Sequence, residues 1–291
     1  MRPSWAGAAV LLCLLSTQGR ESGSPKPAGS TPLGKKPPGG TPEIFAPGII
    51  STKADEYALE VSASGDEILF VRETSIMLAN RNENGTWTVP AVAPFSGKYV
   101  DGEPCFSPDG RKIYFMSRRP LSGSKLPSNL WVSDKSGGEW QAARPVTGLV
   151  LEKQLHAPSV AASGSIYEDG IVIFEWSNGR YRPGTKLPTV NGLFPFITPD
   201  ESYIIYAKRP PGRQDHDLFV SFQKPDGTWG PDLSLGDEIN SPDNEGNAYV
   251  TADGRYLFFS KKYEIYWVSA DIIQNLKKKS EENNRKMKGV T

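Results

Sequence analysis

Histidine and cysteine are scarce in this chain of 291 residues, which contains two of each. A zinc site takes three or four closely placed nitrogen or sulfur ligands, and His156 and His216 fall in different parts of the repeat pattern described below. The sequence also lacks a G-x-S-x-G motif, which places the nucleophile of many Ser-His-Asp hydrolases. It therefore predicts neither a zinc site nor a serine hydrolase.

Excess charge of either sign is also missing. The 33 basic residues balance 33 acidic ones, which gives a formal net charge of zero. A general nucleic-acid binder needs a basic face that neutralises phosphates. We therefore expect no nucleic-acid partner.

Long apolar runs are missing beyond the first residues. Residues 6–15 (AGAAVLLCLL) follow Arg2, and this run is too short to cross a bilayer as a mature helix. Such a run after a positive residue is typical of an export signal. We therefore expect residues 1–20 to be a signal peptide, the protein to be periplasmic or extracellular, and the mature chain to have no transmembrane span. Cys13 leaves lipid anchoring open, and a retained signal segment is a second alternative.

Without the signal peptide Cys105 is the only cysteine, so no internal disulfide can form. Its position inside a strand-like segment predicts that it packs in the core. Apolar residues are nearly missing from residues 21–42, which predicts a disordered linker. The folded part is expected at residues 43–275, and residues 276–291 are expected to form a polar tail that is helical or disordered.

What the chain does contain is a polar turn followed by a β-strand, repeated five times. The turn runs directly into alternating apolar side chains, which is typical of a turn that leads into a strand. A short apolar strand precedes each turn, and further strand-like segments follow. The copies are residues 62–70 (SASGDEILF), 107–115 (SPDGRKIYF), 161–167 (AASGSIY), 198–206 (TPDESYIIY) and 251–259 (TADGRYLFF).

Self-similarity with a period of roughly 40 to 50 residues is typical of β-propellers. We predict an all-β fold, a β-propeller of five four-stranded blades, with six blades as the alternative. The fifth copy lacks a fourth strand, whereas residues 42–51 (PEIFAPGIIS) precede the first copy without a partner. Pairing this N-terminal strand with the last blade would close the ring and remove an open sheet edge.

A hairpin signal recurs after the third strand of four copies. A Gly-containing turn supplies the positive φ angles of a tight hairpin, and an aromatic residue follows it. We expect these aromatic residues to pack beside the hairpin; the alternative is a ring of stacking platforms. They are Trp87, Trp140, Tyr181 and Trp229.

These segments resemble the TolB-type, WD-like β-propeller repeat. The resemblance rests on SPDGRKIYF, TPDESYIIY and TADGRYLFF, and on PEIFAPGIIST, PFSGKYVDGEPCFSPDG and GDEINSPDNEG. It covers about residues 42–273 and implies an exported binding or scaffold protein of the bacterial cell envelope, without a catalytic motif. The third copy departs from the pattern, because AASG replaces SPDG there.

A candidate site follows from aligning the innermost strands on their turns. If the blades are radial, polar side chains at equivalent positions meet around one mouth of the central channel. The predicted ligand-binding residues are Glu56, Asp101, Glu103, His156, Glu245 and Asn247. The long loops at residues 118–128 and 209–217, with Arg118, Arg119 and Arg213, are expected to add a contact surface on the same face.

The sequence is compatible with three functions for this mouth of the channel. The leading hypothesis is a non-enzymatic module that binds a protein or a glycan of the cell envelope. The competing hypothesis is a carbohydrate-active hydrolase that uses the rim carboxylates as acid and base. A third is a structural module stabilised by Ca²⁺, which binds groups of carboxylate oxygens; no other cofactor is predicted.

Overall fold

The computed structural model describes residues 35–149, 154 and 156–288 of the chain. All of these belong to the unit Thr31–Thr291. The predicted signal peptide and residues 21–34 of the predicted linker lie outside the described residues.

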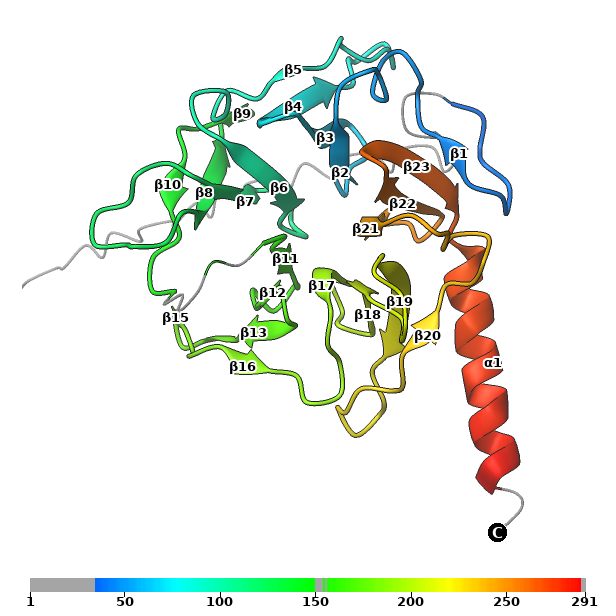
Figure 1. The fold of residues 1–291 in the computed structure, drawn as a ribbon. Helices are drawn as coiled ribbons and strands as arrows, with labels where there is room; N and C mark the ends of the chain where they lie inside the picture. Colours follow the sequence, from blue (N-terminus) through cyan, green and yellow to red (C-terminus); the bar gives the residue numbers. More distant parts are fainter. Residues whose placement is uncertain (1–34, 150–153, 155, 289–291) are drawn as a thin grey trace, which may run out of the picture. The chain divides into compact units, whose positions relative to one another are not determined.

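The described residues form five four-stranded antiparallel sheets, which are the blades of a propeller (Figure 1). The predicted all-β, five-bladed architecture is therefore confirmed. Blade 1 contains β2 (Glu56–Val61), β3 (Glu67–Arg72), β4 (Ser75–Asn80) and β5 (Ala91–Val92). Blade 2 contains β6 (Asp101–Phe106), β7 (Lys112–Ser117), β8 (Asn129–Ser136) and β10 (Arg144–Pro145), with β9 (Glu139–Trp140) beside β8.

Blade 3 is the most irregular of the five. It contains β11 (Ser159–Val160), β12 (Ile166–Glu168), β13 (Val172–Phe174) and β16 (Thr185–Lys186), and a separate hairpin of β14 (Trp176–Ser177) and β15 (Arg180–Tyr181). Blade 4 contains β17 (Leu193–Ile197), β18 (Tyr203–Lys208), β19 (Asp217–Phe222) and β20 (Leu233–Ser234). Blade 5 contains β21 (Glu245–Val250), β22 (Tyr256–Lys261), β23 (Glu264–Ser269) and β1 (Glu43–Ile44).

The innermost strands of the blades form a closed ring. β2 contacts β6, β6 contacts β11, β11 contacts β17, β17 contacts β21, and β21 contacts β2. The other strands of each blade run outward from this ring, as Figure 1 shows. The residues on the innermost strands therefore surround a central channel.

The N-terminal strand closes the ring as predicted. Glu43 and Ile44 of β1 pair with Trp267 and Tyr266 of β23, and the Phe45 N–H donates to the Ile265 carbonyl at 2.8 Å. Phe45 itself is 0% exposed. Because β1 comes from the start of the fold and β23 from its end, this pairing covers the edge of β23 and joins the two ends of the propeller.

The repeated turn holds its shape through local hydrogen bonds. In the second copy the Ser107 hydroxyl donates to Asp109 at 2.6 Å, and the Arg111 N–H donates to the same carboxylate at 3.1 Å. Gly110 takes the left-handed conformation at φ +68°, which L side chains rarely adopt. Asp109 therefore stabilises the turn, and the bond from Ser107 is the main reason that the pKa of Asp109 is lowered.

Ordered contacts continue past the predicted start of the propeller at residue 43, and a helix crosses its predicted end at residue 275. The Ser269 N–H donates to the Gly39 carbonyl at 3.0 Å, and Pro38 is buried, so ordered structure begins before residue 43. At the other end α1 (Asp271–Lys288) begins before the predicted boundary, and Ile273 is only 1% exposed. Among the described residues no helix is both long enough and apolar enough to span a membrane.

Candidate functional site

The innermost strands share a backbone irregularity that decides which side chains face the channel. One residue in each of them adopts a positive φ between 48° and 54°. The register of pairing to the next strand shifts there in blades 1, 2, 4 and 5, and such bulges re-aim the neighbouring side chains. The five residues are Ala58, Glu103, Ala157, Phe194 and Asn247.

Because of this bulge, the acids that precede it do not face the channel as expected. Glu56 is 0% exposed, and Asp101 and Glu245 are each 1% exposed. Glu56 accepts hydrogen bonds from the Thr52 hydroxyl at 2.6 Å and from Arg72 Nε at 2.8 Å. It is thus held inside the protein by a hydroxyl and a cation.

Asp101 and Glu245 have equivalent partners. Asp101 accepts from Ser96 and Arg119, and Glu245 accepts from Ser241 at 2.6 Å. The structure therefore does not bring Glu56 and Asp101 to the lining of the mouth cavity. Glu245 borders the mouth cavity but is buried, and burial raises the pKa of its carboxyl.

The channel nearly closes at the bulge. The cavity there is about 30 Å³ and is lined by the five positive-φ residues and their neighbours along the strands. One water needs a cavity of roughly 10–15 Å³, so this waist has room for a water molecule and not for a larger solute. The mouth above it is therefore a cup with a closed base.

The mouth cavity has a volume of about 780 Å³ and is lined by residues of blades 1, 2, 4 and 5. Two glycines make room for its aromatic side chains. A Cβ on Gly246 would lie 3.2 Å from the Phe194 ring, and one on Gly102 would lie 3.4 Å from the Tyr57 hydroxyl. Tyr263, which is 63% exposed, adds a third aromatic ring to the lining.

Three of the predicted residues, Glu103, Glu245 and Asn247, line this mouth. Glu103 and Asn247 also line the waist, and His156 lies beside Glu103. His156 Nδ1 lies 3.6 Å from Glu103 Oε2, and the Ala157 N–H donates to the same oxygen at 3.0 Å. The hydrogen bond to Glu103 raises the pKa of His156, because the carboxylate favours the protonated imidazole.

The charged residues of the predicted contact loops divide into two groups. Arg119 is 9% exposed and holds Asp101, and Arg213 forms ion pairs with Asp215 and Asp217, so both belong to the fold. Arg118 and Arg209 are exposed, and within the described part of the chain neither forms an ion pair.

Both free arginines belong to the mouth. Arg209 lines the mouth cavity. Arg118 lies close enough to Tyr57 that its charge partly offsets the rise of the Tyr57 pKa to about 12, a rise caused mainly by burial. The sequence interpretation named Arg118 as a contact residue but missed Arg209 and the aromatic lining, because it followed the acids. The signal that could have found the lining is Gly246 beside the Phe194 position of the neighbouring strand.

No group of three or more His, Cys, Asp or Glu side chains suited to a metal ion occurs within residues 35–149, 154 and 156–288. The calcium alternative stays an untested prediction. Cys105 is buried, as predicted, and forms no disulfide. Among the hairpin aromatics, Trp140 and Trp229 are 6% and 5% exposed, so the packing interpretation is confirmed for these two.

Comparison with known proteins finds distant structural similarities only. No family model and no curated protein matches the chain. Among solved structures it is similar to a "putative TolB" from Agrobacterium tumefaciens, with 14% identity, a TM-score of 0.46, and coverage of 72% of this chain and 71% of that one. The five blades themselves confirm the predicted propeller fold.

Two further similar structures have different described activities. A hydrazine synthase from Kuenenia stuttgartiensis is 11% identical, with a TM-score of 0.42 and coverage of 75% of this chain and 59% of that one. A puromycin-hydrolyzing peptidase from Mycobacterium tuberculosis is 12% identical, with a TM-score of 0.40 and coverage of 70% and 33%. At these identities the likeness concerns the propeller alone.

Proposed function

We propose that this protein is a non-enzymatic, exported binding module, and that its mouth cavity holds a segment of a partner protein in the cell envelope. The segment carries a carboxylate next to an aromatic or aliphatic side chain. The observation that carries this proposal is the closed cup itself, which is about 780 Å³ in volume above a waist of about 30 Å³. A bound side chain can enter such a cup and be surrounded without passing through the ring.

The apolar part of the segment matches the aromatic lining. Tyr57, Phe194 and Tyr263 come from three different blades and line one cavity. Tyrosine is enriched at the centres of protein interfaces, because its large side chain buries much area with few rotatable bonds. The ring of strands fixes these side chains before binding, so little conformational entropy is lost when the partner arrives.

The acidic part of the segment matches the free cations. Arg118 and Arg209 are exposed and have no ion-pair partner among the described residues, whereas Lys262 already pairs with Asp243 at 3.1 Å. A guanidinium binds a carboxylate through two parallel hydrogen bonds. This pattern favours an acidic protein segment over a neutral glycan at the mouth.

The hydrolase alternative gains no support from Glu56 and Asp101, two of the four acids on which it was based. Glycoside hydrolases need two carboxyl groups that face the scissile bond from opposite sides. Glu56 and Asp101 instead face arginine side chains inside the protein. An acid held in a buried ion pair is not placed to protonate a leaving group on a substrate in the mouth.

Selection from a displayed library of random peptides would test the proposal. We expect peptides selected on the parent protein to be enriched in Asp or Glu beside an aromatic or Leu residue. The Arg118→Ala/Arg209→Ala variant and the Phe194→Ala variant should each weaken binding of the selected peptides by at least about tenfold, roughly 1.4 kcal/mol.

The matched control is Lys224→Ala, which removes an exposed cation beyond the far end of β19. It should leave peptide binding unchanged. Selected peptides without acidic residues, or equal binding by all four proteins, would refute the proposed mouth site.

A further inference from the structure

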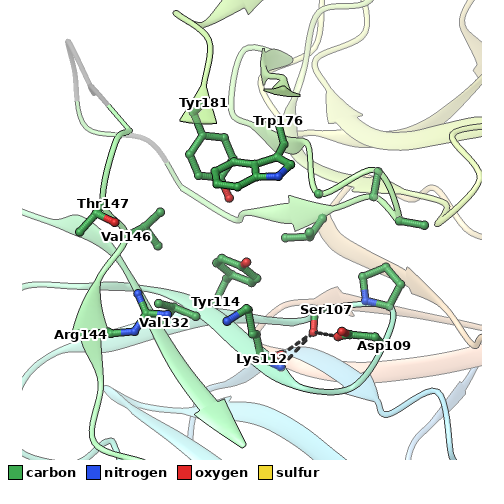
Figure 2. Close-up of a pocket in the computed structure, with 15 residues that line it drawn as sticks. Ser107, Asp109, Lys112, Tyr114, Val132, Arg144, Val146, Thr147, Trp176 and Tyr181 are labelled. Atoms are coloured by element: carbon green, nitrogen blue, oxygen red, sulfur yellow. Dashed lines mark hydrogen bonds between the residues drawn. The ribbon is translucent and has the colours of Figure 1, made fainter. Parts of the chain in front are cut away.

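A second hollow lies outside the channel, in a groove between blades 2 and 3. Its volume is about 510 Å³, within the range of roughly 300–1,000 Å³ that is common for small-molecule sites. Blade 2 contributes the turn with Ser107 and Asp109, the strand with Lys112 and Tyr114, and the segment from Arg144 onward. Blade 3 contributes its own turn and its separate hairpin, as Figure 2 shows.

The groove exists because the hairpin aromatic of blade 3 fills less of the space between blades than its counterparts do. Trp140 of blade 2 is 6% exposed and donates its indole N–H to Glu67 of blade 1 at 2.9 Å. Trp229 of blade 4 is 5% exposed and packs with residues of blade 3. The equivalent residue in blade 3 is Tyr181, which has a smaller side chain and remains partly exposed.

Aromatic rings form two facing walls of this groove. Trp176 and Tyr181 lie on one side and Tyr114 on the other (Figure 2). The Trp176 and Tyr181 rings meet edge to face, with centroids 4.7 Å apart, and Trp176 is 43% exposed. Gly164 lets the indole fold over the turn, because a Cβ there would lie 3.3 Å from the Trp176 ring.

The polar groups of the groove offer donors and acceptors without excess charge. Lys112 and Arg144 both bind the carboxylate of Asp134, and the Arg144 Nε–Asp134 Oδ2 distance is 2.8 Å. Arg144 is 49% exposed and has five N–H donors, of which Asp134 occupies two. Asp109 accepts from the Ser107 hydroxyl through one carboxylate oxygen, so its other oxygen is available.

We propose that this groove binds a neutral sugar unit of an oligosaccharide. One face of a pyranose ring carries C–H groups, which pack against the electron-rich face of an aromatic ring such as Trp176. The hydroxyls at the ring edge both donate and accept hydrogen bonds, which matches Asp109 on one side of the groove and Arg144 on the other. A free phosphate or carboxylate ligand fits less well, because Asp134 already neutralises both cations.

This proposal goes beyond the proposed function, because the groove and the mouth are lined by different residues and differ in charge. Arg209 lines the mouth and Arg118 lies near its Tyr57, both without ion-pair partners in the described chain, whereas the cations of the groove are paired. An acidic segment therefore favours the mouth, and an uncharged hydroxyl-rich ligand favours the groove. Each site can fail experimentally without affecting the other.

Saturation-transfer NMR with cellotetraose, maltotetraose and chitotetraose as probes tests the groove, together with the tryptophan fluorescence of the parent protein. We expect at least one probe to bind the parent. Trp176→Ala should weaken that binding by at least about tenfold, and Arg144→Ala should weaken it several-fold. The matched control is Tyr263→Ala, which removes an exposed aromatic side chain at the mouth and should leave sugar binding unchanged.

Circular dichroism shows whether each variant is folded. If Trp176→Ala does not fold, sugar binding by Arg144→Ala still decides the proposal. Absence of binding for all three sugars would overturn the proposal. Equal sugar binding by the parent and both groove variants would also overturn the proposal. A loss of sugar binding in Tyr263→Ala alone would overturn it as well. Displacement of the sugar by the acidic peptides selected at the mouth would also overturn it, because it would place both ligands in one site.

Discussion

Replacing Arg119 tests whether the acid at the start of an innermost strand belongs to the fold or to an open mouth. Arg119 is 9% exposed, and its Nη2 donates to the two carboxylate oxygens of Asp101 at 3.0 and 3.1 Å. The same nitrogen donates to the Phe95 carbonyl at 2.6 Å. The guanidinium also lies over the rings of Phe115 and Trp131, 5.0 and 5.2 Å from their centroids.

The expected cost follows from leaving Asp101 without its cation. Its side chain is 0% exposed, so water cannot take the place of the guanidinium. Removing one partner of a buried ion pair typically costs about 3–5 kcal/mol of the free energy of unfolding. Arg119→Met keeps most of the aliphatic stem, and the hydroxyls of Ser96 and Ser117 still donate to Asp101. We therefore expect a loss near the lower end, about 3 kcal/mol.

Urea unfolding followed by circular dichroism measures this loss. The control is Arg182→Met, because Arg182 and Glu175 form a pair at 3.4 Å with side chains 60% and 58% exposed. Exposed pairs contribute roughly 0–1 kcal/mol. Adding Asp101→Asn to Arg119→Met should recover part of the loss, since no buried charge then remains. If Arg119→Met and Arg182→Met cost the same at an unchanged m-value, Asp101 is hydrated and the buried-pair argument fails.

Two further predictions concern the seam and the core. Phe45→Ala should lower the free energy of unfolding by about 3–5 kcal/mol, because Phe45 is 0% exposed and packs against Phe258 and Trp267; a loss below about 1 kcal/mol in urea unfolding would contradict its role in closing the ring. Glu168 is 0% exposed, neither carboxylate oxygen has a partner among the described residues, and burial raises its pKa. Stability should therefore fall as the pH rises above the unfolded pKa of about 4.3, and Glu168→Leu should make that fall smaller; parallel pH profiles of parent and variant would exclude this.

The blades could be predicted because their signals are local. Ser107, Asp109 and Gly110 form the turn with one another, so the turn is readable wherever the same residue types recur. The closing strand could be predicted by counting the strands in each copy. The fifth copy lacks a fourth strand, and residues 42–51 precede the first copy without a partner. The closed ring of blades could therefore be predicted from the repeated segments alone.

The orientation of the candidate residues could not be predicted, because a non-local feature sets it. Ala58, Glu103 and Phe194 adopt positive φ angles although none is glycine, and L residues take this conformation only where the surroundings impose it. Here the surroundings are the neighbouring innermost strands, as in the bond from the Ala157 N–H to Glu103 of the next blade. A simple alternation places Glu56 and Ala58 on one face, whereas the bulge between Tyr57 and Glu60 separates them.

Departures from the repeat are therefore more informative about binding than the repeat is. Trp176 precedes the hairpin of blade 3, where the other copies have no tryptophan, and its exposed ring lines the groove beside that blade. Phe194 occupies a positive-φ position that holds alanine in blades 1 and 3, and its ring lies at the base of the mouth. Turn residues such as Asp109 mainly hold one blade together. Because the ring supplies the scaffold in any case, substitutions at Trp176 and Phe194 should change binding while the unfolding transition stays nearly the same.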